Sequence, residues 1–337
     1  MALLTGPLPM VPAAGKAGPG STEPRIVALG GGHGLAASLS ALRLLTTELT
    51  AVVTVADDGG SSGRLRTELG VLPPGDLRMA LSALCDDTDW GRTWRDVMQH
   101  RFKSRNGGQG SLDNHALGNL LIVTLWELLG DTVAGLQWAG ALLGARGQVL
   151  PMASVPLTIE GQVRGLSADG TENTRTIHGQ ASLAVAGPVE NVRLLPLDAP
   201  ACEEALTAIE LADWIVLGPG SWYTSVLPHL LLPELRQALC GTAAKRCLTM
   251  NLDVNDKETT GMSAADHLRV IARYAPEFGV DVVLADPGSI LDRQDFARAA
   301  SMIGAEVVLA KVAGSSGRAE HDPLRLAAAY HDIFGTG

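Results

Sequence analysis

The sequence predicts an α/β protein with a Rossmann-like, doubly wound, mostly parallel sheet and an antiparallel β insertion. Three observations lead to this fold class. Short apolar runs alternate with helical patterns, the runs are apolar throughout rather than at every second residue, and one stretch rich in Gly and Pro breaks the alternation. Continuous hydrophobicity is typical of strands buried on both faces, and alternation of strand and helix is typical of a parallel sheet.

The predicted strands are short runs rich in Val and Leu, most of which end at Gly, Asp or Asn. They are Ile26–Leu29, Ala51–Ala56, Trp214–Leu217, Arg246–Met250, Val280–Ala285 and Glu306–Lys311. The helical patterns are Leu35–Leu45, Asp76–Leu84, Asn114–Leu129, Thr132–Leu143, Ala201–Leu211, Ser263–Tyr274, Asp292–Ala300 and Pro323–Ile333. Residues 148–197 show little helical periodicity and predict the β-rich insertion. We expect one large domain over 25–337, preceded by a Pro-rich, disordered leader over 1–24.

The composition limits the partners that the protein can have. With 337 residues and 46% hydrophobic content, the chain can bury a substantial core. A net charge of -10 opposes binding to nucleic acid or to an anionic membrane, so an anionic ligand requires a local cluster of Arg and backbone amides. Apolar stretches are too short for a membrane span, no signal peptide is recognisable, and the four cysteines lack metal-ligand spacing. We therefore expect a cytoplasmic protein without membrane insertion.

The first strand runs into a glycine-rich turn that contains Gly31, Gly32, His33 and Gly34, and a helix follows at once. Glycine permits close approach of a phosphate to the backbone, and a helix N-terminus offers free N–H groups. The stretch also matches G-x-G-x-x-A, which is typical of dinucleotide binding, although a tight turn without ligand gives the same pattern. His33 is a candidate acid or base, with a spacer role in the turn as the favoured alternative.

The second strand continues into Asp57-Asp58-Gly59-Gly60-Ser61-Ser62-Gly63-Arg64-Leu65-Arg66. Small residues, hydroxyls and two guanidiniums suit an anion held by main-chain amides and charge-assisted bonds, whereas a flexible surface loop is the alternative. Asp57 stands where a ribose-binding acid would lie in a dinucleotide fold. Asp57 and Asp58 are also candidates to bind Mg²⁺ together with a substrate phosphate, with an Asx turn as the alternative for one of them.

Further polar residues follow predicted strands or begin helices. Asp76 is expected to cap a helix, but Arg78 in the same first turn opposes the helix dipole and so needs another reason. His115 and Asn119 open an apolar helix, where either a ligand contact or tight packing explains the poor helix formers. Two more polar stretches, 217–225 and 251–261, follow strands at the sheet edge where parallel sheets bind ligands.

At these residues the sequence resembles the YvcK/CofD-like family, in particular its YvcK branch of gluconeogenesis factors, from about Arg25 to the C-terminus. The blocks that carry the resemblance are Gly30–Leu35, Val53–Arg66, Pro73–Arg78, Leu117–Leu120 and Leu217–Ser225. The resemblance implies a Rossmann-like core that binds a UDP-sugar such as UDP-N-acetylglucosamine. It also implies a bacterial protein needed for normal cell shape and wall synthesis on gluconeogenic carbon. The CofD branch is similar in its core but is a transferase that joins phospholactate to a deazaflavin alcohol.

The resemblance also implies a set of ligand-binding residues. They are Gly31, Gly32, Gly34, Asp57, Asp58, Ser61, Ser62, Arg64, Asn119, Gly220, Ser221, Tyr223 and Thr224. The residues themselves add His33, Arg78 and Asn251. The resemblance also implies Arg318, which is displaced upstream of the place where the family carries a basic residue before His-Asp. Three positions depart from the family pattern: His33 replaces Thr, Met79 replaces Asn, and Asn114 replaces Gly.

Three functions are compatible with the sequence. The first is a non-catalytic regulator that senses a UDP-sugar, the second is a transferase of the phospholactate type, and the third is an NAD-dependent oxidoreductase. The residues after Asp57 argue against the third, because a plain dinucleotide fold does not continue in this way. We can name no catalytic residue, since no Ser–His–Asp order, metal-ligand cluster or activated cysteine is recognisable. Beyond a UDP-sugar and Mg²⁺ no cofactor is expected, and a homo-oligomer and a protein partner stay open.

Overall fold

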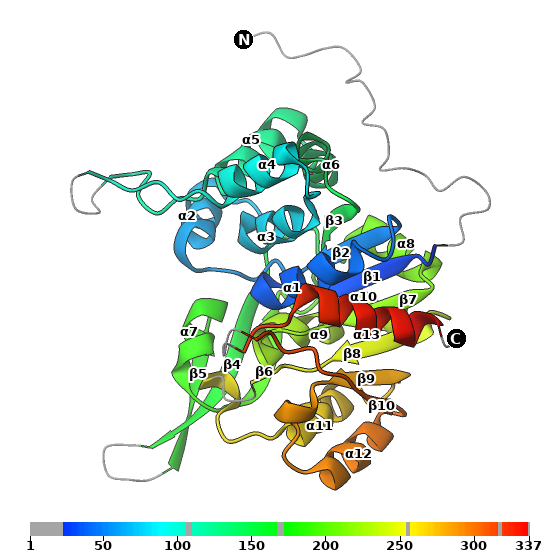
Figure 1. Cartoon of the computed structure of the whole chain (residues 1–337). Helices are drawn as coiled ribbons and strands as arrows, with labels where there is room; N and C mark the ends of the chain where they lie inside the picture. Colours follow the sequence, from blue (N-terminus) through cyan, green and yellow to red (C-terminus); the bar gives the residue numbers. More distant parts are fainter. Residues whose placement is uncertain (1–22, 106–109, 167–171, 254–256, 316–318, 336–337) are drawn as a thin grey trace.

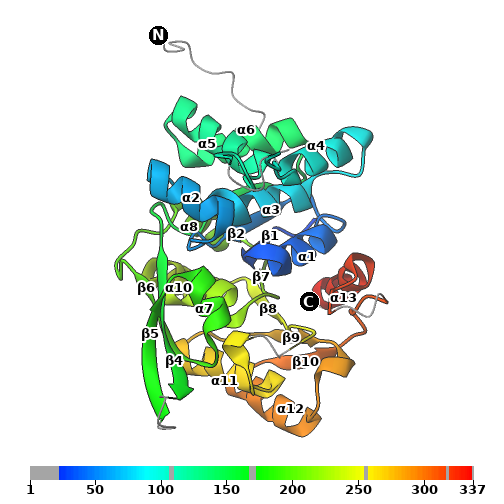
Figure 2. The same cartoon turned by 90° about the vertical axis from the view of Figure 1, so that its left-hand side faces the viewer.

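A computed structural model of the chain describes residues 23–105, 110–166, 172–253, 257–315 and 319–335. At its centre is a seven-stranded sheet in the order β10-β9-β8-β7-β1-β2-β3, in which every neighbouring pair is parallel (Figure 1). Helices α1 (Gly32–Leu42) and α13 (Pro323–Gly335) lie on one face, and α8 (Glu203–Leu211) and α10 (Pro233–Gly241) lie on the other (Figure 2). The predicted Rossmann-like fold is confirmed.

All six predicted strands are present, with ends that differ by a few residues. The sheet consists of β1 (Ile26–Gly30), β2 (Leu49–Val53), β3 (Gln148–Pro151), β7 (Trp214–Leu217), β8 (Lys245–Thr249), β9 (Val282–Ala285) and β10 (Glu306–Leu309). Every residue of β1, β2 and β7 is buried, as their continuous hydrophobicity predicts. β3 is the additional strand: sequence analysis placed it in the insertion, but it pairs in parallel with β2 at the edge of the main sheet.

All eight predicted helices are also present. Besides α1, α8, α10 and α13, the helices around the main sheet are α2 (Gly60–Leu69), α3 (Pro74–Leu84), α4 (Asp89–Gln99), α5 (Leu117–Leu129), α6 (Thr132–Leu143), α9 (Pro228–Leu231), α11 (Ala264–Tyr274) and α12 (Arg293–Met302). Three of the longer helices, α2, α4 and α10, were missed. The stretch that forms α2 lacks a helical pattern because it carries only two apolar residues, Leu65 and Leu69. In the structure, α2 buries Leu65 together with the small residues Ser61, Ser62 and Gly63.

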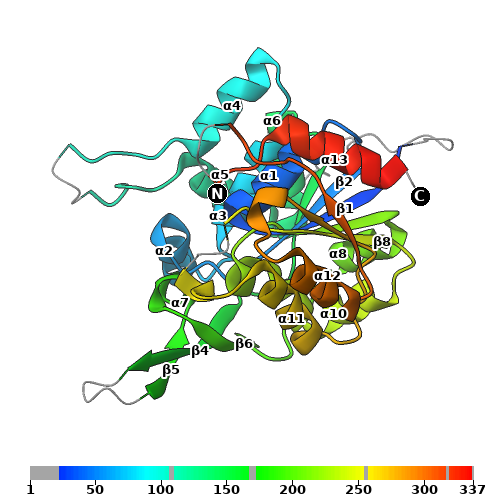
Figure 3. The same cartoon turned by 60° about the horizontal axis from the view of Figure 1, so that its bottom comes forward.

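The antiparallel insertion is confirmed but is shorter than predicted. Strands β4 (Thr158–Leu166), β5 (Glu172–His178) and β6 (Val189–Leu195) form a separate sheet in the order β5-β4-β6, with α7 (Gln180–Ala186) packed against it. It projects away from the main sheet (Figure 3). The predicted leader lies outside the described residues except for Glu23 and Pro24. Among the helices described, none is both long enough and apolar enough to cross a membrane.

The order of the strands decides where a ligand site can lie. β1 is flanked by β2 on one side and by β7 on the other, so the connections that follow β1 and β7 leave the sheet in different directions. In an open parallel sheet such a reversal leaves a crevice at the carboxyl ends of the strands, and ligands bind there. The loops after β1, β2 and β7 meet at this crevice.

Candidate phosphate-binding site

A pocket of about 300 Å³ opens at the carboxyl end of β2, between the first turns of α2 and α3. We call it the phosphate pocket. Its lining residues are Asp57, Gly59, Gly60, Ser61, Ser62, Gly75, Asp76, Arg78, Met79, Arg101, Asn114 and Asn119. Because backbone N–H groups of a helix's first turn lack partners within the helix, both helices present donors on this side. The pocket therefore combines these amides with two guanidiniums, Arg78 and Arg101, and with two carboxylates, Asp57 and Asp76.

The glycine-rich turn after β1 is held in place by packing. Gly32 has a φ of 55°, which favours glycine, and α1 begins there with Gly31 as its N-cap. A Cβ atom on Gly31 would lie 2.6 Å from Oδ2 of Asp76, and one on Gly34 would lie 2.5 Å from Cα of Gly220 and still closer to the carbonyl oxygen of Pro219. The glycines thus let three loops touch, while His33 is exposed beside them.

Asp76 is a buried carboxylate of the pocket, not the helix cap that the sequence predicted. Helix α3 begins at Pro74, with Pro73 in the N-cap position. The Asp76 side chain instead turns toward β2, where Oδ2 accepts a hydrogen bond of 3.0 Å from the hydroxyl of Thr54. Burial and the charge of Asp57 raise the pKa of Asp76 to about 6. Burial likewise raises the pKa of Asp57, so the two carboxylates form a pair that is costly to ionise.

Asp58, the neighbour of Asp57, serves a different contact. Its Oδ1 accepts a hydrogen bond of 2.8 Å from the backbone N–H of Ala181, at the start of α7. Arg66 also attaches the insertion, because its guanidinium donates to the carbonyl of Leu157 at 2.6 Å and to the hydroxyl of Thr158 at 2.9 Å. Part of the polar stretch after β2 therefore connects the insertion to the main domain.

A chain of buried hydrogen bonds forms one wall of the pocket. The hydroxyl of Ser61 accepts from the backbone N–H of Ala116 at 3.3 Å and from Nδ2 of Asn119 at 3.0 Å, and it lies 3.0 Å from Nδ1 of His115. Since the hydroxyl has one proton and already accepts twice, it donates that proton to Nδ1 of His115. This requires a neutral imidazole, in agreement with burial lowering the pKa of His115.

The same chain of hydrogen bonds orients Arg78. Its Nε donates to Oδ1 of Asn119 at 2.9 Å, and its Nη1 donates to the side-chain carbonyl of Gln99. The Arg78 side chain is almost completely buried, which lowers its pKa to about 10, so it stays charged at neutral pH. A cation at the start of α3 opposes the helix dipole. The hydrogen bonds to Asn119 and Gln99 hold this charge at the pocket. They explain why an arginine stands in the first turn of α3 although it opposes the helix dipole.

The loop after β7 is close to the pocket but uses its polar groups internally. Oδ1 of Asn251 accepts from the N–H of Gly220 at 2.8 Å, and its Nδ2 donates to the carbonyl of Gly220 at 2.9 Å. Glu258 accepts from the N–H of Tyr223 at 3.0 Å and from the hydroxyl of Thr224 at 3.2 Å. Tyr223, Thr224 and Glu258 are all buried, so these contacts fix the shape of the loop.

The structure therefore divides the expected ligand-binding residues into groups. Those that line the phosphate pocket are Asp57, Ser61, Ser62, Arg78 and Asn119. Those that lie in the adjoining turns are Gly31, Gly32, His33, Gly34, Gly220 and Ser221. Those with internal contacts are Asp58, Tyr223, Thr224, Asn251 and Arg64, whose Nη2 donates to the carbonyl of Asp113. Arg318 lies outside the described residues.

Three polar residues that line the pocket are absent from the expected ligand-binding set: Asp76, Arg101 and Asn114. For Asn114 a signal was present, because it stands where the family has Gly. Its φ of 59° lies in the left-handed region, which Asn tolerates better than most residues. Arg101 follows α4, a helix that the sequence analysis did not predict. Within the described part of the chain, no group of three or more His, Cys, Asp or Glu side chains is placed to hold a metal ion.

The fold and the site define a Rossmann-like α/β protein with an anion-type pocket at the switch point of its sheet. Residues 26–311 match the family model described as 2-phospho-L-lactate transferase CofD. The chain belongs to this CofD family, and its relatives place it in the YvcK branch of gluconeogenesis factors.

Two relatives illustrate that branch. The putative gluconeogenesis factor of Mycobacterium leprae is 51% identical over 94% of this chain and 87% of its own length. The gluconeogenesis factor of Bacillus subtilis is 35% identical over 80% of this chain and 81% of its own length. A crystal structure of a UPF0052 family member from Bacillus halodurans has a TM-score of 0.79 and 33% identity, and the match covers 92% of this chain and 99% of that one.

Proposed function

We propose that the chain is a cytoplasmic regulator that binds a UDP-sugar, of the UDP-N-acetylglucosamine type, through the phosphate pocket. Arg78 is the observation that carries this proposal. A protein of net charge -10 keeps one guanidinium buried at a helix start, and both Asn119 and Gln99 hold it there. Such a fixed, charge-assisted donor suits a diphosphate. At about 300 Å³ the pocket is at the small end for ligand sites, so it fits the diphosphate and its immediate neighbours.

We further propose that Mg²⁺ binds with the diphosphate, between Asp57 and Asp76. The residues fit this ion, because burial raises the pKa of both carboxylates, the charge of Asp57 raises that of Asp76 further, and a divalent cation favours the ionised forms. Mg²⁺ is commonly bound by one or two carboxylates together with phosphate oxygens. The pair differs from the Asp57–Asp58 pair that the sequence suggested, because Asp58 is exposed and bonded to Ala181. The ion would supply charge neutralisation for the diphosphate.

A transferase of the CofD type is the second candidate function. It is supported by the family match and by the same carboxylate pair, since metal-assisted phosphate chemistry uses such groups. We favour the regulator because the curated relatives are named gluconeogenesis factors, and we propose for this chain a role in cell shape and wall synthesis during gluconeogenic growth.

Thermal unfolding with different nucleotides tests the proposal. Only a ligand that prefers the folded state raises the unfolding midpoint, and at about 100 times its dissociation constant the gain is about 2.7 kcal/mol. We expect UDP-N-acetylglucosamine with Mg²⁺ to raise the midpoint by several degrees and NAD and NADP to leave it unchanged. A rise with NAD and none with any UDP-sugar would contradict the proposal and favour an ordinary dinucleotide site.

A further inference from the structure

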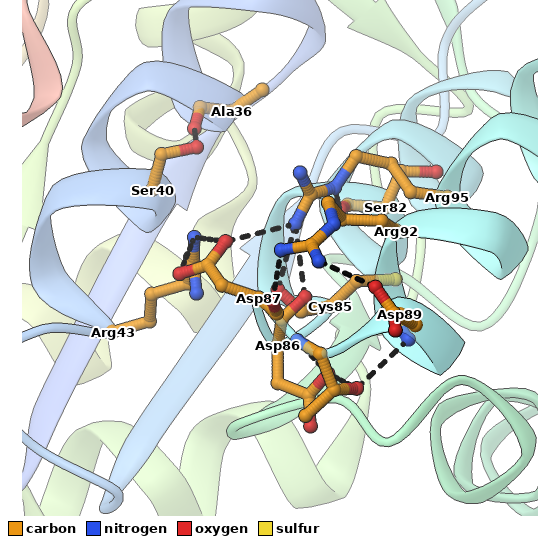
Figure 4. Close-up of polar contacts among 12 residues, drawn as sticks. Ala36, Ser40, Arg43, Ser82, Cys85, Asp86, Asp87, Asp89, Arg92 and Arg95 are labelled. Carbon is orange, nitrogen blue, oxygen red and sulfur yellow. Dashed lines mark hydrogen bonds and ion pairs between the residues drawn. The ribbon is translucent and has the colours of Figure 1, made fainter.

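A second and larger cavity, of about 760 Å³, adjoins the phosphate pocket between α1, α3 and α4. Arg78, Met79 and Arg101 line both cavities. At the end away from the pocket, Arg43 of α1 and Arg95 of α4 meet at Asp87 (Figure 4). We call this second cavity the arginine cleft.

The charge of the arginine cleft is opposite to that of the whole chain. Its charged lining consists of Arg43, Arg78, Arg95 and Arg101 against Asp87 and Asp96, an excess of two positive charges in a protein of net charge -10. Solvation alone gives no reason to gather four guanidiniums in one concave surface, because like charges repel there. A local excess of this kind attracts an anion.

Arg43 has hydrogen-bonding capacity that the protein does not use. Its side chain is 9% exposed, and its Nη2 donates to both oxygens of Asp87, at 2.9 and 3.1 Å. Its Nε and Nη1 are buried and have no hydrogen-bond partner among the residues that the structure describes. A carboxylate or phosphate normally engages two nitrogens of a guanidinium fork, whereas here both oxygens share one. Two buried cationic donors are therefore left unsatisfied, which is costly unless another group binds them.

Arg95 faces Asp87 from the other side and is held in position by the backbone. Its guanidinium donates to the carbonyls of Ser82, Cys85 and Asp86 at 3.3, 3.1 and 3.2 Å, and its Nη2 lies 3.5 Å from Oδ1 of Asp87. Asp87 itself is 61% exposed, and the hydrogen bond from Arg43 is the main cause that lowers its pKa. The two cations are thus fixed, while the carboxylate between them can turn out into solvent.

We propose that the arginine cleft binds a second small anion, carrying a phosphate or carboxylate group, which replaces Asp87 between Arg43 and Arg95. This goes beyond the proposed function, because a UDP-sugar bound through its diphosphate in the phosphate pocket carries no further charge for these two arginines. Asp87 is the internal anion that occupies the position when the ligand is absent. Arg78 and Arg101 line both cavities, so the proposed anion site lies at the far end of one continuous basic surface that begins at the phosphate pocket.

Calorimetric titration of the full chain with inorganic pyrophosphate, at constant ionic strength, tests this site. We expect Arg95→Gln to weaken binding about tenfold or more, because a charge-assisted contact is lost. We expect Asp87→Asn to strengthen binding about threefold or more, because the competing internal anion is removed. Arg92→Gln is the matched control: it removes the same charge from α4, but Arg92 contacts the Asp89 side chain and the backbone carbonyl of Asp87, not the Asp87 carboxylate. Because Arg92 does not line the cleft, affinity stays within about twofold.

The opposite signs of the two changes distinguish the arginine cleft from the phosphate pocket, which neither Asp87 nor Arg95 lines. The titration is repeated with saturating UDP-N-acetylglucosamine, where the same order of variants is expected. Equal affinities in Asp87→Asn and the parent, or equal losses in Arg95→Gln and Arg92→Gln, would overturn the proposal. So would a loss of UDP-N-acetylglucosamine binding in Arg95→Gln, which would make the cleft part of the nucleotide site.

If UDP-N-acetylglucosamine does not bind but the pyrophosphate pattern holds, only the proposed function fails. Should Arg95→Gln not fold, Asp87→Asn decides alone, because it keeps the shape of the side chain.

Discussion

Two loops at the same edge of the sheet have similar composition and different roles. After β2, the small and hydroxyl residues lead into α2, and Asp57, Ser61 and Ser62 line the phosphate pocket. After β7, a comparable stretch is buried, and its N–H and hydroxyl groups bond to Asn251 and Glu258. The difference lies in the partners. After β2, Ser61 bonds to Asn119, which itself lines the pocket, whereas after β7 the polar groups bond to Asn251 and Glu258, neither of which lines it.

The largest effect that we expect concerns the contact between the glycine-rich turn after β1 and the loop after β7. Gly34→Ala should lower the free energy of unfolding by about 3 kcal/mol, because the added Cβ meets backbone atoms of Pro219 and Gly220 that cannot move aside. Gly241→Ala is the control, since no atom lies within 4 Å of its added Cβ and it ends a helix. Denaturant unfolding measures both. Similar stabilities of the two variants would show that the loops do not touch as described.

The second prediction concerns the structural role of the loop after β7. Glu258→Ala should cost about 2 kcal/mol of stability, because the N–H of Tyr223 and the hydroxyl of Thr224 lose a buried acceptor. Glu258→Gln keeps one acceptor oxygen and should cost less. Chemical denaturation gives these values, and titration with UDP-N-acetylglucosamine should give nearly parental affinity for the folded Glu258→Gln protein. A loss of affinity larger than the loss of stability would instead make this loop part of the ligand site.

The third prediction uses the raised pKa of Asp76. Because the pKa of Asp76 is about 6 in the folded protein and near the ordinary 3.8 of an aspartate in the unfolded chain, the folded protein holds this proton more tightly, and the wild type loses stability as the pH rises from about 4 through about 6. Asp76→Asn removes this loss. Its stability relative to the wild type should therefore rise by about 1 kcal/mol between pH 5 and pH 7.5.

Mg²⁺ should act in the opposite sense on the same pair of proteins. At pH 7.5 it should raise the melting temperature of the wild type in the presence of nucleotide, and it should have little effect on Asp76→Asn. Melting curves at both pH values, with Mg²⁺ or EDTA, provide the measurement. An equal response of both proteins to Mg²⁺ would remove Asp76 from the metal site, and a pH-independent difference between them would contradict its raised pKa.

The smallest effect should come from Arg64. Its guanidinium donates to the carbonyl of Asp113 and lies outside the group that lines the phosphate pocket. Arg64→Gln should therefore change the affinity for UDP-N-acetylglucosamine by no more than about threefold, the range of a partly exposed charge. Calorimetric titration checks this value. A tenfold loss would show that Arg64 turns toward the ligand when it binds.

The sequence was informative where packing alone determines structure. The buried strands β1, β2 and β7 follow from their largely apolar sequences, and the start of α11 follows from neighbouring residues, because Ser263 and Asp266 form a capping box. The sequence was less informative where a residue far along the chain determines the position of a strand or a side chain. The four residues of β3 gain their place only by pairing with β2, and the direction of the Asp76 side chain depends on Thr54. Likewise, the residues 222–226 do not by themselves predict a contact with Glu258, which lies more than thirty residues further along the chain.

Titration of UDP-N-acetylglucosamine in the presence of Mg²⁺ into the parent, Arg78→Lys and Thr224→Val tests the central claim most directly. Lys keeps the charge of Arg78 but not its fork, and Val keeps the shape of Thr224 but not the hydroxyl that bonds to Glu258. If the diphosphate binds in the phosphate pocket, Arg78→Lys lowers the affinity about tenfold or more, and Thr224→Val leaves it within about twofold. The reverse order, with Thr224→Val weakened and Arg78→Lys unchanged, would contradict the account and move the ligand to the loop after β7.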